Sequence, residues 1–151
     1  MSEPTDTPEY DDTNVFAKIL RGELPSHKVY EDDDFIAIMD VMPQAPGHTL
    51  VIPKAPSRNL LDTDAEVLQK LLPFTQRMAR AIKKAFQADG ITIKQLNEPA
   101  GGQVVFHLHV HVIPRHDGEP LKRHGDGMEK HEVLAANADK IRAALKTMPE
   151  S

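Results

Sequence analysis

The stretch His107-Leu108-His109-Val110-His111-Val112-Ile113 decides the fold expected for this chain. Side chains of a β-strand alternate between its two faces, so this spacing predicts a strand with His107, His109 and His111 on one side and apolar residues on the other. Imidazole is the only side chain whose unperturbed pKa allows its charge to change near physiological pH. We therefore expect the apolar side to join the core and the histidine side to carry the chemistry.

Composition limits the class of protein. The chain has 151 residues, 40% of them hydrophobic, with 18 basic and 23 acidic residues, a formal net charge of -5 and no cysteine. This length predicts one domain, and the negative charge argues against nucleic acid or an anionic membrane as a partner. The missing cysteines exclude disulfides and thiolate metal sites. With no apolar run long enough to span a membrane and an acidic start unlike a signal peptide, we expect a cytoplasmic protein.

The pattern along the chain predicts an α+β fold. Residues 1–13 are polar and acidic and predict a disordered tail, whereas residues 14–151 predict a single domain. Asn14 is a candidate N-cap of a short helix, a long helix is expected after Asp64, and a C-terminal helix is expected from about residue 133. The expected strands cover residues 29–31, 35–40, 48–52, 91–96 and 104–113. Since βαβ alternation is absent, we predict an antiparallel five-stranded sheet with one long helix and a C-terminal helix.

A metal site is one use of the histidine row. A strand rises about 3.3 Å per residue, which separates the α-carbons of His107 and His111 by roughly 13 Å, whereas zinc binds each nitrogen at about 2.0 to 2.1 Å. One ion therefore cannot collect all three rings. A zinc site made of His107, His109 and His48 stays open as an alternative.

Covalent catalysis is the use that we favour. A neutral imidazole at His109 can displace a leaving group from phosphorus, forming a phosphorus-nitrogen bond that water breaks in a second step. Such a reaction needs donors around the phosphate oxygens. Asn97 and Gln103 bracket a loop in which Gly101 and Gly102 allow backbone amides to approach closely, and His48 begins another strand.

These residues identify a family resemblance. The chain resembles the histidine triad (HIT) proteins, nucleotide hydrolases and transferases that carry His-x-His-x-His followed by two apolar residues, and is most similar to bacterial nucleoside phosphoramidase-like members. The resemblance covers roughly residues 14–115. Its matching blocks are, in order, Asn14–Ile19, Gly22–Pro25, Val29–Asp32, Asp40 with Pro43, Pro46–His48, Val51–Lys54, and Gly102–Gln103 with Phe106–Arg115.

The resemblance implies a role for each matching residue. His109 corresponds to the nucleophile that becomes adenylylated, His111 to the histidine that contacts the α-phosphate, and His107 with His48 to the pair that orients the nucleophile. Asp40 corresponds to the acid that binds the ribose hydroxyls, which we expect as an exposed carboxylate at a strand end. The remaining implied positions are the apolar slot for the purine (Phe16, Ile19, Ile38 and Val41) and two polar contacts on the phosphate side (Asn97 and Gln103). By spacing alone, the four slot residues are equally well assigned to the core.

The chain also departs from the family pattern. Many bacterial members carry Cys-x-x-Cys where this chain has Asn14 and Ala17, so we do not expect their structural zinc, or any other cofactor. The phosphoramidase branch has Ser or Thr at the position of Val104, whose side chain cannot donate a hydrogen bond.

The predicted function is that of a purine nucleotide-binding hydrolase. It would release AMP from a phosphoramidate-type substrate through a covalent nucleotidyl-histidine intermediate. A dinucleoside polyphosphate hydrolase and a nucleotide-binding adaptor with incidental catalysis are the alternatives. The resemblance also implies a homodimer in which the sheet extends across both subunits.

Overall fold

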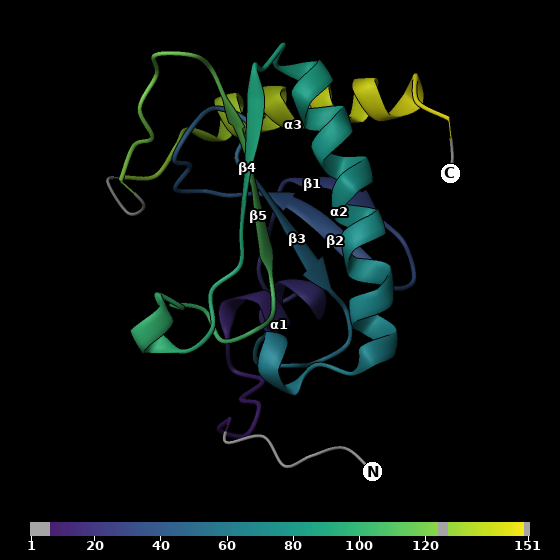
Figure 1. Cartoon of the computed structure of the whole chain (residues 1–151), viewed down its shortest axis with the longest axis vertical. Helices are drawn as coiled ribbons and strands as arrows, with labels where there is room; N and C mark the ends of the chain where they lie inside the picture. The colour runs from purple at the N-terminus through teal and green to yellow at the C-terminus, as the bar shows by residue number, and fades with distance from the viewer. Residues whose placement is uncertain (1–6, 124–126, 150–151) are drawn as a thin grey trace.

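The computed structural model describes residues 7–123 and 127–149 and confirms the predicted α+β fold (Figure 1). Five strands form one antiparallel sheet in the order β1-β2-β3-β5-β4: β1 (Lys28–Glu31), β2 (Phe35–Met39), β3 (Thr49–Pro53), β4 (Gly90–Lys94) and β5 (Val110–Arg115). The helices are α1 (Val15–Leu20), α2 (Ala65–Ala85) and α3 (His131–Lys146), with short 3-10 turns at Leu60–Asp62 and Pro99–Gly101.

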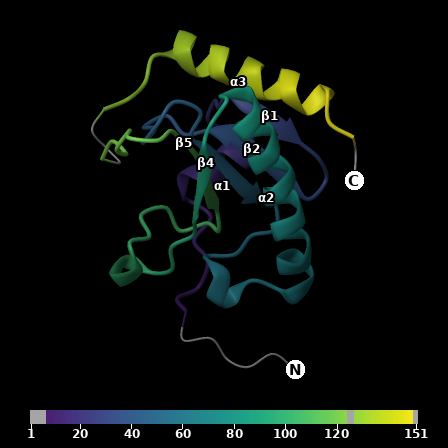
Figure 2. The same cartoon turned by 45° about the horizontal axis from the view of Figure 1, so that its top comes forward.

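Alternation along the strands divides the core between the two faces of the sheet. In β2, Phe35, Ala37 and Met39 belong to the core cluster that includes residues of α2 and α3, whereas Ile36 and Ile38 pack with α1 on the opposite face. Helix α3 packs across α2 and β1 (Figure 2). Among the described residues, α2 and α3 therefore cover one face of the sheet and α1 packs on the other.

A local sequence signal sets the start of α1. Asn14 caps α1 as predicted, because its Oδ1 accepts a hydrogen bond from the Ala17 amide at 2.9 Å. Helix α2 begins directly after Asp64, and its apolar stripe buries Leu71, Met78 and Ile82.

The predicted histidine strand is too long at its start. We expected a strand over residues 104–113, but β5 begins at Val110, so His107 and His109 precede it. The amide of Leu108 donates to the carbonyl of Ser57, in the loop beyond the end of β3, at 2.9 Å. The neighbouring strand β3 ends at Pro53, which has no amide hydrogen to continue a ladder. Of the three histidines expected on one strand, only His111 therefore lies within β5.

The described part of the segment predicted as a tail, residues 7–13, makes contacts with the rest of the chain and within itself. The hydroxyl of Tyr10 lies 2.7 Å from Nδ1 of His107, and Asp11 accepts hydrogen bonds from the amide and hydroxyl of Thr13. Tyr10 supplies the aromatic surface that offsets the entropy of ordering this segment. The prediction for residues 1–6 lies outside the described residues.

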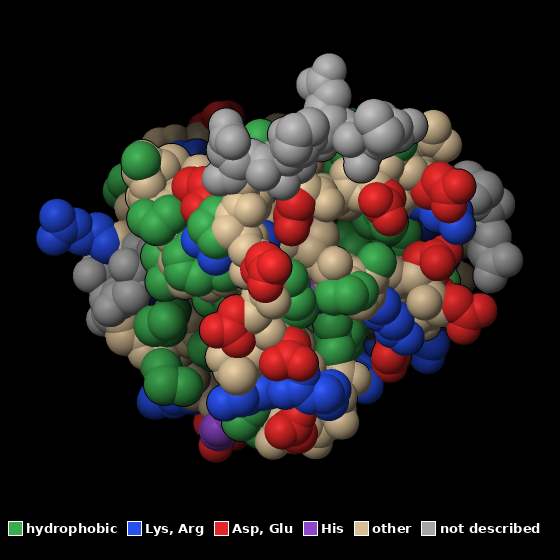
Figure 3. Space-filling view, turned by 90° about the horizontal axis from the view of Figure 1, so that it is seen from below, with side chains coloured by type: hydrophobic (Ala, Val, Ile, Leu, Met, Phe, Trp, Pro, Cys, Tyr) green, Lys and Arg blue, Asp and Glu red, His purple; other side chains and the backbone are tan. Residues whose placement is uncertain are grey.

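The surface carries charges of both signs. The face drawn in Figure 3 has acidic, basic and apolar side chains interspersed, in keeping with the small net charge of -5. No helix of the described residues has the length and apolar content that a bilayer crossing requires.

Candidate active site

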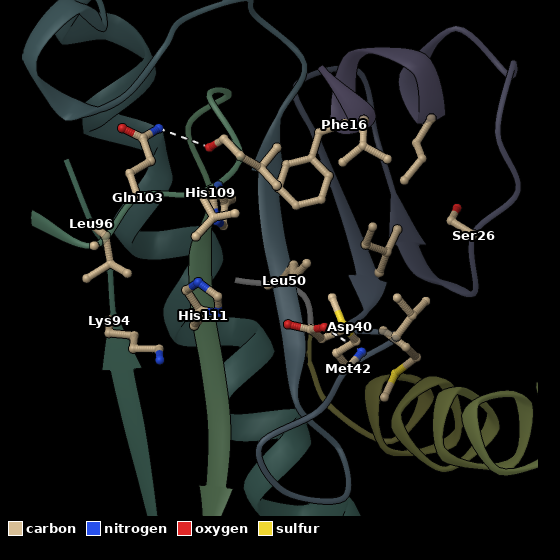
Figure 4. A pocket seen from close by; sticks show the side chains of 18 of the residues that line it. Phe16, Ser26, Asp40, Met42, Leu50, Lys94, Leu96, Gln103, His109 and His111 are labelled. Atoms are coloured by element: carbon tan, nitrogen blue, oxygen red, sulfur yellow. Dashed lines mark hydrogen bonds between the residues drawn. The ribbon is translucent and has the colours of Figure 1, made fainter. Parts of the chain in front are cut away.

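A cavity of about 500 Å³ lies on the α1 side of the sheet (Figure 4). One wall is apolar and includes Phe16 and Ile19 of α1, Ile38 of β2 and Val41 just beyond it, the four residues predicted to form the purine slot. The structure thus brings these four side chains together at one opening. An apolar cleft with a few converging polar groups is typical of a small-molecule site.

His109 presents a defined ring nitrogen at this cavity. Its Nδ1 lies 2.6 Å from the carbonyl oxygen of His107, and because a carbonyl can only accept, Nδ1 carries the proton. In the neutral ring, Nε2 then bears the lone pair that a nucleophile needs. The ring packs edge-on against Phe16, with centroids 4.8 Å apart, and against His111, with centroids 5.0 Å apart.

A buried chain of hydrogen bonds sets the tautomer of His111. The amide of Gln44 donates to Nδ1 of His48 at 3.0 Å, so the proton of the neutral His48 ring is on Nε2. That nitrogen lies 2.9 Å from Nδ1 of His111 and 3.4 Å from Oδ2 of Asp40. His111 therefore accepts at Nδ1 and carries its own proton on Nε2, as a donor for an anionic ligand.

Asp40 lies at the end of β2, as predicted, but it is not exposed. Its side chain lines the cavity while the residue is only 5% accessible, because Oδ1 accepts the Met42 amide at 2.8 Å and the His48 ring packs against it. A carboxylate accepts hydrogen bonds from hydroxyl groups as well as from amides.

His107 lies behind the cavity and does not line it. The ring is 1% exposed, its Nε2 lies 2.7 Å from the carbonyl oxygen of Pro53, and its Nδ1 lies 2.7 Å from the Tyr10 hydroxyl. Burial lowers the pKa of His107, because desolvation disfavours the charged ring.

The histidine cluster does not fit a metal ion. Ligand atoms of Asp40, His48 and His111 lie within 4.8 Å of one another, a spacing that could suit zinc. However, the Gln44 amide keeps the proton of His48 on Nε2, the nitrogen that faces the other two. The alternative set of His48, His107 and His109 fails similarly, since Nε2 of His107 donates to Pro53 and Nδ1 accepts from Tyr10.

The two predicted phosphate-side contacts have other partners. Gln103 lines the cavity, but it is buried, and its amide bonds the backbone of Glu98, Arg58 and Val105. The side chain of Asn97 does not line the cavity and bonds Leu60 and Gln95. Both side chains hold loops together in this structure, because their donors and acceptors face neighbouring backbone segments.

Sequence reasoning missed Lys94, which lines the cavity on the wall opposite α1 (Figure 4). It is paired with His111 in the register of β4 and β5, and its ammonium donates to Gln44. Among the described residues lining this cavity it is the only Lys or Arg. The sequence showed only that Lys94 lies in a predicted strand. Such a pattern does not reveal which residue of the neighbouring strand is paired with it.

Comparison with known proteins identifies the family of this chain. The HIT domain model matches residues 21–118. A HIT-like protein from Bartonella henselae, described as involved in cell-cycle regulation, has a similar solved structure with a TM-score of 0.85 and 58% identity, covering 90% of this chain and 99% of that one. A hypothetical histidine triad nucleotide-binding protein from Sulfolobus tokodaii has a TM-score of 0.78 and 35% identity, covering 85% and 89%. Adenylylsulfatase HINT3 of Arabidopsis thaliana is 36% identical over 142 residues, 90% of this chain and 71% of that protein. The chain belongs to the HIT family of nucleotide-binding hydrolases and transferases.

Proposed function

We propose that this protein hydrolyses purine nucleoside 5'-phosphoryl compounds through a covalent intermediate on His109 and releases AMP. Adenosine phosphoramidate is the substrate proposed first. The observation that carries the proposal is the hydrogen bond from Nδ1 of His109 to the carbonyl of His107 at 2.6 Å, which puts the lone pair on Nε2. A cavity lined by both this ring and an apolar wall supports it further.

In the proposed first step, Nε2 of His109 attacks phosphorus while the bond from phosphorus to the leaving group breaks. The bonding electrons leave with the amine, which takes up a proton from water, while His109 keeps its proton on Nδ1 and becomes a phosphoryl-imidazolium. His111, with its proton on Nε2, donates to a phosphoryl oxygen and stabilises the charge that develops there. Its partner His48 keeps that proton on Nε2, because the Nε2–H group of His48 donates a hydrogen bond to Nδ1 of His111.

In the proposed second step, water attacks phosphorus and the bond between phosphorus and Nε2 breaks. AMP leaves, and the imidazole of His109 returns to its neutral form as the proton of water is released. Division of one displacement into two removes the need for water to expel the amine directly.

The nucleoside is proposed to lie along the apolar wall. Phe16, Ile19, Ile38 and Val41 would enclose the purine, and Asp40 at the end of β2 would accept hydrogen bonds from the ribose hydroxyls. In this proposed binding mode the phosphoryl group would lie near the two histidines, since His109 and His111 lie between the apolar wall and the β4 wall in Figure 4.

The test combines His109→Ala with a matched control, His131→Ala, which removes an exposed imidazole on α3. We expect His109→Ala to lower kcat for adenosine phosphoramidate by more than about a thousandfold and to retain AMP binding, while His131→Ala keeps normal turnover. Intact mass of the wild type mixed with substrate should gain one adenylyl group. Normal turnover by His109→Ala would exclude His109 as the nucleophile. If the wild type bound AMP but did not turn over the substrate, the result would instead favour a nucleotide-binding adaptor.

Lys94 favours a second candidate function, the hydrolysis of adenylyl compounds with an anionic leaving group, such as dinucleoside polyphosphates. The ammonium lies on the wall opposite the purine slot, where a leaving group would extend, and it can neutralise a departing anion. The HINT3 relative is named an adenylylsulfatase, an activity with such a leaving group. The ratio of kcat/KM values for adenosine phosphoramidate, adenylyl sulfate and a diadenosine polyphosphate decides between the two functions.

We also propose that the protein forms a homodimer through β4. This strand is at the edge of the sheet, and its Ile93 is 45% exposed. An exposed strand edge with apolar side chains is a site for pairing with a second copy. Molar mass by light scattering should be that of a dimer for the wild type and should decrease towards that of a monomer for Ile93→Lys.

A further inference from the structure

The segment before α1 touches the back of the histidine motif. Tyr10 lies 97 residues before His107 in the chain, yet its hydroxyl is 2.7 Å from Nδ1 of that ring, and the two rings meet edge-to-face with centroids 5.6 Å apart. Asn14 in turn donates from Nδ2 to the Tyr10 hydroxyl at 3.0 Å while its Oδ1 caps α1. One short segment thus connects the start of α1 to the histidine motif.

The direction of these hydrogen bonds follows from the backbone. The carbonyl of Pro53 can only accept, so Nε2 of His107 carries the proton of the neutral ring, and Nδ1 must accept. The Tyr10 hydroxyl therefore donates to Nδ1, and its oxygen accepts from Asn14. Both nitrogens of an almost fully buried ring have a partner, and loss of either partner would leave a buried polar atom unsatisfied.

His107 is also the residue that orients His109. Its peptide carbonyl accepts a hydrogen bond from Nδ1 of His109, and this bond determines the tautomer of the His109 ring and the direction of its Nε2. A change in the conformation of His107 would move that carbonyl, and displacement of a reacting atom by about 1 Å can lower a rate severely.

We infer that Tyr10 is a positioning residue for the reaction, because its hydroxyl donates to Nδ1 while Nε2 donates to the Pro53 carbonyl, and the two bonds together hold the His107 ring in one orientation and thereby orient His109 towards phosphorus. This inference rests on the proposed function. Tyr10 does not line the cavity, so it acts on the rate of the chemical step and not on nucleotide binding.

The closing experiment compares Tyr10→Phe with Tyr30→Phe, the same chemical change at the only other tyrosine, whose ring packs against Phe74. We expect Tyr10→Phe to lower kcat roughly tenfold with an unchanged Kd for AMP, since one buried acceptor is left without its donor. Tyr30→Phe should keep the wild-type kcat. Thermal unfolding checks that both variants are folded.

Two further measurements separate positioning from simple structural support. Nitrogen NMR of the His107 ring should report an unprotonated Nδ1 in the wild type and an altered ring in Tyr10→Phe. In a double-mutant cycle with His107→Leu, whose side chain has no acceptor, the effect of Tyr10→Phe on kcat should disappear, because the Tyr10 hydroxyl has no ring nitrogen left to orient.

A wild-type kcat in Tyr10→Phe, or effects of the two substitutions that simply multiply, would overturn the inference. A wild type without any turnover would instead refute the proposed function. In that case kcat cannot be compared, and the NMR measurement alone tests the role of Tyr10. Unchanged His107 and His109 ring signals in Tyr10→Phe would reject the positioning role.

Discussion

Gly47→Ala tests how the loop before β3 positions His48. Gly47 has a φ of +93°, and a Cβ added there would lie 2.6, 2.8 and 2.9 Å from three carbon atoms of the Phe86 ring. A left-handed conformation costs an L-residue about 1 to 2 kcal/mol, and overpacking costs about 1 to 3 kcal/mol. Because Phe86 is half-buried and its ring can move, we expect the free energy of unfolding to decrease by roughly 2 to 4 kcal/mol.

Urea unfolding of three variants separates the two causes. At Gly22 the φ is +80° but no atom lies within 4 Å of the added Cβ, so Gly22→Ala measures conformational strain alone. Gly90→Ala has neither an unusual φ nor a close neighbour and should remain within about 0.5 kcal/mol of the wild type. Equal decreases in the free energy of unfolding for Gly22→Ala and Gly47→Ala would show that the contact with Phe86 does not add to the destabilisation. Turnover should also fall in Gly47→Ala, since His48 is the next residue and its ring orients His111.

The remaining predictions concern pH and substrate choice. Burial lowers the pKa of His107, so as pH falls below about 6.5 the unfolded chain binds a proton that the folded ring does not, and the free energy of unfolding should fall. Urea unfolding at several pH values should show a weaker pH dependence for His107→Gln, and parallel curves would contradict this assignment. For Lys94→Met we expect about tenfold lower kcat/KM with adenylyl sulfate and a change of less than about twofold with adenosine phosphoramidate. Equal losses on both substrates would argue against a role with anionic leaving groups.

Local patterns predicted the side of the sheet on which two of the three histidines lie, whereas His107 does not line the cavity. Leu108, Val110 and Val112 do join the core with α2 and α3, and His109 and His111 line the cavity on the opposite side. The cap at Asn14 was predictable for the same reason, because a helix cap depends only on residues within one turn.

The sequence by itself determined the alternation of polar and apolar residues, and hence the α+β class, but it predicted three histidines in one row where only His109 and His111 line the cavity. Only the tertiary structure decided which atoms those rings bond. His48 and His111 are 63 residues apart, and Tyr10 and His107 are 97 residues apart. Strand register placed Lys94 beside His111, and packing buried Asp40. Periodicity describes neighbours within one element, whereas tautomers, burial and charge pairing depend on segments that meet only after the chain has folded.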